Sequence, residues 1–75
     1  MKSEEMISYI VASDVHLRDG IGLETYINGS LVMEIFRDDS EKRTYVTVYS
    51  KNIDLAHLEA SVTKFKEKID AAYID

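Results

Sequence analysis

The last third of the sequence carries apolar residues at spacings of three and four, the pattern of one face of an α-helix. The positions that repeat are Leu55, Leu58, Val62, Phe65, Ile69 and Ala72 or Tyr73. Asp54 precedes them and is a suitable N-cap, because its carboxylate can accept a hydrogen bond from an amide of the first turn. We expect a helix near residues 55–73, and its stripe is too short to favour a coiled coil over packing onto the rest of the chain.

Residues 7–49 lack this spacing and alternate instead, with β-branched and aromatic residues between turn signals, as strands do. Turn candidates occur at Arg18-Asp19-Gly20, Asn28-Gly29 and Asp38-Asp39-Ser40-Glu41. They divide the region into strands near 7–17, 21–27, 31–37 and 43–50. The sequence therefore predicts one α+β domain over residues 1–75, a four-stranded antiparallel β-meander with a single C-terminal amphipathic helix packed on one face.

Matching apolar with apolar positions across the turns selects the loop lengths. A three-residue bulged loop with Gly29 in the left-handed conformation pairs Leu23 with Met33, whereas a two-residue turn pairs Leu23 with a glutamate. A four-residue loop at Asp38 to Glu41 then sets Met33 beside Val46, and the first hairpin sets Val15 beside Leu23. The face expected under the helix is nearly all apolar: Ile7, Tyr9, Val11, Val15, Leu17, Ile21, Leu23, Leu31, Met33, Ile35, Val46 and Val48.

The opposite face has no second helix to cover it, and it is richer in aromatic residues than a solvated face needs to be. It carries Ser8, Ile10, Asp14, His16, Glu24, Tyr26, Val32, Glu34, Phe36, Arg43, Tyr45, Thr47 and Tyr49. Exposed aromatic surface edged with charge is typical of protein interfaces, although tyrosines also occur on solvated strand faces. We predict an interface there, formed by Tyr26, Val32, Glu34, Phe36, Tyr45 and Tyr49.

Composition narrows the class of partner. The 75 residues include 9 Lys plus Arg against 14 Asp plus Glu, a net charge of −5, which argues against nucleic acid or an anionic membrane as the partner. There is no cysteine, so neither a disulfide nor a thiolate metal site is available, and apolar packing must hold the fold together. Neither a signal peptide nor a membrane span is visible, and we expect a cytoplasmic protein that needs no cofactor or metal.

One short motif suggests metal chemistry. Ser13-Asp14-Val15-His16-Leu17 follows the apolar run of residues 7–12, and Asp14 and His16, two residues apart on a strand, point the same way. The segment resembles the first metal-binding motif of the calcineurin-like metallophosphoesterases. That resemblance implies further Gly-Asp and Gly-Asn-His ligand motifs, which this sequence lacks. We therefore interpret Asp14 and His16 as solvated residues, with a metal-dependent hydrolase as the least favoured function.

No other catalytic arrangement stands out. Glu24 and Glu34 are expected on the same face of adjacent strands, two register positions apart, where an acid pair beside Tyr45 could transfer protons, but no pocket is implied. We expect no enzyme activity. The leading hypothesis is a small protein-binding module that self-associates through the uncovered sheet face, as a homodimer or with another protein. The alternative is an acidic inhibitor of a basic partner, of the antitoxin or immunity type, using Asp14, Asp19, Glu24, Glu34 and the acids of residues 38–41.

Overall fold

The computed structural model describes residues 5–14 and 19–69 of the chain. Four strands and one helix follow one another in sequence: β1 (Ile7–Asp14), β2 (Gly20–Ile27), β3 (Ser30–Asp38), β4 (Arg43–Val48) and α1 (Leu55–Lys68). The strands form one antiparallel sheet in the order β1-β2-β3-β4, so β1 and β4 are its edges. The predicted α+β meander with one C-terminal helix is confirmed.

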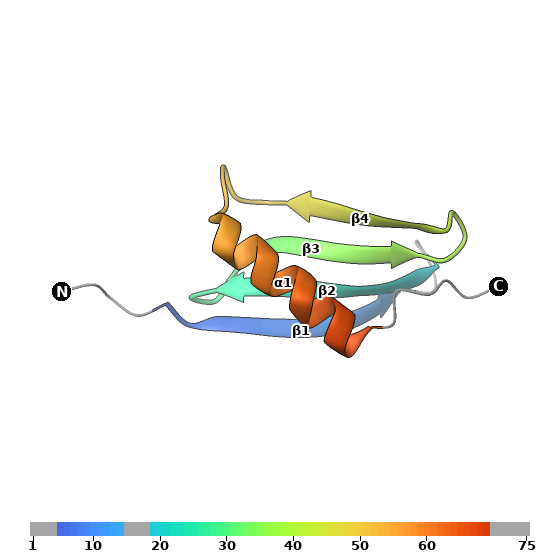
Figure 1. Cartoon of the computed structure of the whole chain (residues 1–75), viewed down its shortest axis with the longest axis horizontal. Helices are drawn as coiled ribbons and strands as arrows, with labels where there is room; N and C mark the ends of the chain where they lie inside the picture. The colour runs from blue at the N-terminus through green and yellow to red at the C-terminus, as the bar shows by residue number, and fades with distance from the viewer. Residues whose placement is uncertain (1–4, 15–18, 70–75) are drawn as a thin grey trace.

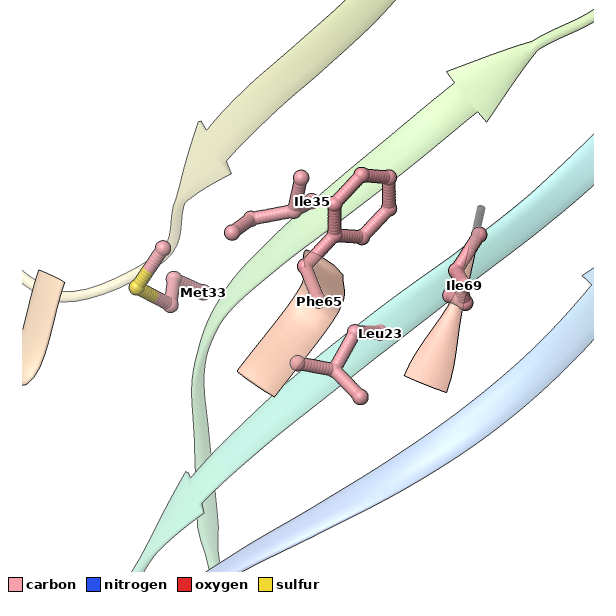
Figure 2. Packing of buried hydrophobic residues seen from close by; sticks show 5 residues of the cluster. All are labelled: Leu23, Met33, Ile35, Phe65 and Ile69. Atoms are coloured by element: carbon pink, nitrogen blue, oxygen red, sulfur yellow. The ribbon is translucent and has the colours of Figure 1, made fainter. Parts of the chain in front are cut away.

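Helix α1 crosses one face of the sheet diagonally and packs on the two central strands, β2 and β3 (Figure 1). The buried apolar cluster lies between these layers and consists of Leu23, Met33, Ile35, Phe65 and Ile69. Phe65 and Ile69 point from the helix towards the sheet residues Leu23 and Ile35 (Figure 2). From Leu58 to Ile69 the apolar stripe therefore packs against the sheet, as its spacing predicted, whereas Leu55 at its start is exposed.

Both ends of α1 have a local cause. At the start, Asp54 is extended and its Oδ1 accepts a hydrogen bond from the amide of Ala56 at 2.8 Å, which is the predicted N-cap. At the end, Ile69 leaves the helix with φ −130° and ψ 121°, and its side chain is buried in the core cluster. The helix is therefore shorter than the predicted 55–73, and residues 70–75 lie outside the described part of the chain.

The turn between β2 and β3 differs from the expected three-residue loop. Ile27 pairs directly with Ser30, and Asn28 and Gly29 have φ values of 53° and 85°, so this is a two-residue turn with both residues left-handed. The bulge lies within the strands instead, where the register shifts between Thr25 and Tyr26. With a two-residue turn and no bulge, Leu23 would lie opposite a glutamate. The extra residue in β3 shifts the register by one and places Leu23 opposite Ile35.

The register is displaced from the predicted one in all three hairpins. Leu23 pairs with Ile35 rather than Met33 and with Val11 rather than Val15, and Met33 pairs with Val48 rather than Val46. Every displacement is an even number of residues, so each of these side chains keeps its face of the sheet. The expected strand through residues 15–17 falls on residues outside the described part of the chain.

Two polar pairs are buried beside the apolar cluster, and sequence patterning singled out neither. The hydroxyls of Thr25 and Ser61 lie 2.9 Å apart and join β2 to α1, both side chains being fully buried. The guanidinium of Arg37 meets the carboxylate of Asp39 through Nε–Oδ1 at 2.9 Å and Nη2–Oδ2 at 3.3 Å. Such fork-to-fork pairs hold an arginine in one orientation, here at the end of β3.

Candidate functional site

The six predicted interface residues lie in three different environments. Glu34 and Phe36 are buried within the chain, and Val32 packs against the core cluster on the helix side. Tyr26 is half-buried, whereas Tyr45 and Tyr49 are exposed at and just beyond β4. The sheet does not bring the six side chains together into one exposed patch.

Phe36 is buried on the face away from the helix, with 3% of its surface exposed. Its ring lies across the glycines of β2, because a Cβ atom added at Gly22 would stand 3.0 Å from Phe36 Cδ1 and one added at Gly20 2.9 Å from Phe36 Cζ. The close approach explains why β2 carries glycine at these two positions. Phe36 thus belongs to the packed interior, and its assignment to an exposed face was wrong.

Val32 was also expected on the outer face and lies on the other side. The bulge in the β2–β3 ladder places Leu31 opposite Tyr26 on the outer face and leaves Val32 as the residue without a partner in β2. Val32 packs against the buried cluster under the helix. The bulge therefore exchanges the predicted faces of Leu31 and Val32, because one extra residue reverses the alternation locally.

Two glutamates on the outer face are direct cross-strand neighbours rather than two register positions apart. Glu24 pairs with Glu34, which is only 5% exposed, and Tyr26 donates a hydrogen bond from its hydroxyl to Glu24 Oε1 at 3.0 Å. This hydrogen bond, with smaller contributions from burial and the carboxylate charge, raises the pKa of Tyr26 above its usual value. The phenol is therefore protonated across the neutral pH range, as a hydrogen-bond donor to Glu24 must be.

Several of the other acids that were predicted to attract a basic partner have intramolecular partners. Asp39 holds Arg37, while Asp38 Oδ1 accepts hydrogen bonds from Ser40 Oγ at 2.9 Å and the Glu41 amide at 3.0 Å. Glu41 accepts a hydrogen bond from the hydroxyl of Tyr45, which raises the pKa of Tyr45. These acids order the β3–β4 loop, a role typical of aspartate at turns.

β4 is the most exposed element of the sheet, since all six of its residues are exposed. Exposed fractions are 40% for Tyr45, 50% for Val46, 43% for Val48 and 55% for Tyr49. We call these four residues the β4 surface; by alternation the valines lie on the helix side and the tyrosines on the outer side. Helix α1 packs on β2 and β3, and Val46 and Val48 therefore stay exposed although the alternation correctly assigned them to the helix side.

A second feature is a pocket of about 270 Å³ at the start of α1. Its lining is Glu5, Ile27, Val32, Ser50, Asn52, Ile53, Asp54 and His57. His57 Nε2 lies 2.9 Å from Glu5 Oε1, and this contact joins the segment before β1 to the helix. Because Asp54 caps the helix and Glu5 binds His57, the polar groups at the rim already hold the chain together locally.

The metal ligands suggested by the sequence, Asp14 and His16, fall where the side chains are not described. Within residues 5–14 and 19–69, no three His, Cys, Asp or Glu side chains gather closely enough to hold a metal ion. His16 and the side chain of Asp14 are outside the description, so the metal-binding alternative is not tested. No described helix is long and apolar enough to cross a membrane.

No family model, no curated protein and no solved structure matches this chain.

Proposed function

We propose that this chain is a non-enzymatic protein-binding module that self-associates through the β4 surface. The observation that carries the proposal is the exposure of an entire edge strand, with apolar side chains on both of its faces. Single exposed apolar residues are ordinary on soluble proteins, but a contiguous row of them is characteristic of an interaction site. The surface differs from the one expected from alternation alone: it keeps Tyr45 and Tyr49 and adds Val46 and Val48.

The opposite edge supports the choice of β4. β1 also has exposed apolar residues, Ile7, Ile10 and Val11, with the exposed Met6 just before it, but its Tyr9 and Ala12 are partly covered. The β4 side also has an exposed apolar residue from the helix. Leu55, the first residue of α1, is 64% exposed and follows β4 after a short connection. The apolar surface left uncovered is therefore more continuous on the β4 side.

Sedimentation equilibrium over a wide range of protein concentration tests the proposal. The wild-type chain should shift from monomer to dimer as concentration rises, and Val48→Ser should move that shift to higher concentration. Ile10→Ser is the matched control, since Ile10 is 49% exposed on the other edge strand and should leave association unchanged. A wild-type chain that remains monomeric throughout, with its circular dichroism intact, would show that the proposal is wrong.

A further inference from the structure

We propose that two copies join edge to edge, with β4 pairing antiparallel to β4 of the second copy to make one eight-stranded sheet. A two-fold axis perpendicular to the sheet passes through Val46, so both helices lie on the same face. This inference rests on the proposed self-association and specifies its geometry. It is carried by the backbone of β4, by the uninterrupted exposure of this edge strand, and by the side chains that neighbouring registers bring together.

The backbone of β4 presents hydrogen-bonding groups at the sheet edge. The amide of Tyr49 donates to the carbonyl of Val32 at 2.8 Å, and the register between β3 and β4 continues without a shift. Hydrogen-bonded and non-bonded pairs alternate in an antiparallel ladder, so Thr47 and Tyr45 also face β3. The N–H and C=O groups of Val46 and Val48 therefore point away from β3, where a second strand would bind them.

β4 lacks several of the features that keep an edge strand from pairing. It contains no proline and no lysine, its one charged residue is Arg43 at its start, its ladder with β3 has no bulge, and α1 packs mainly on β2 and β3. Natural proteins protect edges by such devices because an open strand pairs readily with another chain. The other edge strand, β1, also lacks proline and lysine, but exposure along it is interrupted at Tyr9 and Ala12, which are partly covered.

Side-chain chemistry selects the register. With Val46 opposite Val46 of the second copy, Arg43 lies opposite Tyr49, a favourable cation–π pair, and Tyr45 lies opposite Thr47. Shifting the register by two residues in one direction places Arg43 opposite the like-charged Lys51. The shift in the other direction places Lys42, in the turn before β4, opposite the apolar Val48. Of these three registers, the one centred on Val46 is therefore the most favourable.

A proline substitution tests whether the backbone of β4 makes the contact. Val46→Pro removes an amide that faces outward, so it should abolish dimerisation and leave the monomer folded by circular dichroism. Val11→Pro is the matched control on the other edge: the Asn28 amide bonds the Met6 carbonyl at 2.7 Å, so by the same alternation the amide of Val11 also faces outward. This control should dimerise like the wild type. If the wild type dimerises and folded Val46→Pro does too, strand pairing is wrong while self-association stands; a monomeric wild type contradicts both.

Disulfide trapping tests the register in a chain that retains every backbone amide. The protein has no cysteine, so a variant with one introduced cysteine can form a disulfide only with the same residue of a second copy. Val46→Cys should form a covalent dimer on oxidation, since paired residues on the axis have Cα atoms about 5.5 Å apart, within disulfide range. Thr44→Cys should not form a covalent dimer, because residue 44 of the second copy would be roughly 13 Å away along the strand. Trapping of both variants, or of neither, would overturn the register centred on Val46.

Discussion

The contact between Thr25 and Ser61 shows how single residues join the helix to the sheet. Both side chains are fully buried, and their hydroxyls lie 2.9 Å apart. A buried hydroxyl without a partner costs more than its hydrogen bond contributes, because it has also lost its water. The pair therefore stabilises the docking of α1 on β2 only while both members are present.

Thr25→Val should lower the free energy of unfolding by roughly 1–3 kcal/mol, since it leaves the Ser61 hydroxyl buried without its partner. The double variant Thr25→Val/Ser61→Ala should recover much of that loss, because it removes both polar groups. Urea unfolding followed by circular dichroism measures all of these values. A double variant that loses as much as Thr25→Val and Ser61→Ala added together would show that the hydroxyls act independently.

Phe36 illustrates what alternation can and cannot predict for a residue. Its period-two position correctly assigned it to the face away from the helix. Its burial depends on Gly20 and Gly22 of the neighbouring strand, whose missing side chains leave space for the ring. The register that aligns these residues is not encoded in the spacing of apolar positions within one strand, so the sequence pattern predicted an exposed aromatic where the structure has a buried one.

At the scale of elements, Asn28 connects three strands. It forms the left-handed turn between β2 and β3, and its Oδ1 also accepts a hydrogen bond from the amide of Met6, just before β1, at 2.9 Å. Asparagine tolerates the left-handed conformation better than most residues and supplies the acceptor that glycine lacks. The turn signal was visible in the sequence, whereas its second role required the position of β1.

Substitutions at Asn28 should separate these two roles. Asn28→Ala should lower the free energy of unfolding by roughly 2–3 kcal/mol, through about 1–2 kcal/mol of left-handed strain and the loss of one hydrogen bond. Asn28→Gly keeps the favourable backbone and should lose only about 1 kcal/mol with the hydrogen bond. Equal losses in the two variants, measured by urea unfolding, would mean that the turn conformation contributes little.

The strand registers show why elements were easier to predict than their pairing. The turns after β2 and β3 and the face of most residues followed from alternation, and parity was kept in the described ladders except at Leu31 and Val32. A register that slips by two residues keeps each side chain on its face, so alternation cannot distinguish the two. We expected the extra residue in the loop between β2 and β3. The structure has it instead as a bulge in β3, opposite Thr25 and Tyr26.

At the scale of the whole molecule, the outer face should make stability sensitive to alkaline pH. The hydrogen bonds to Glu24 and Glu41 raise the pKa values of Tyr26 and Tyr45 in the folded chain above the usual value of 10.0. Between that value and the raised one, the folded state holds protons that the unfolded state has lost. Stability from these tyrosines is therefore complete below pH 10.0 and declines as pH rises through the folded pKa values.

A double variant, Tyr26→Phe/Tyr45→Phe, tests this prediction. Its free energy of unfolding should fall less steeply than that of the wild type above pH 10.0, because neither phenylalanine can titrate. Urea unfolding at a series of pH values gives both slopes, and an absorbance titration of the wild type follows tyrosinate formation directly. Identical alkaline slopes would show that the two hydrogen bonds do not persist in solution.

The sequence by itself determined the α+β class, the order of strands and helix, the helix cap at Asp54 and the side of the sheet that α1 covers. Each depends on local signals, namely residue spacing, turn residues and capping chemistry, that a short window of sequence contains. Only the tertiary structure decided the registers, the burial of Phe36 and Glu34, and the exposure of β4. A helix about 10 Å wide covers about two strands that lie about 4.8 Å apart, so the outcome at the edges depends on where α1 lies across the sheet.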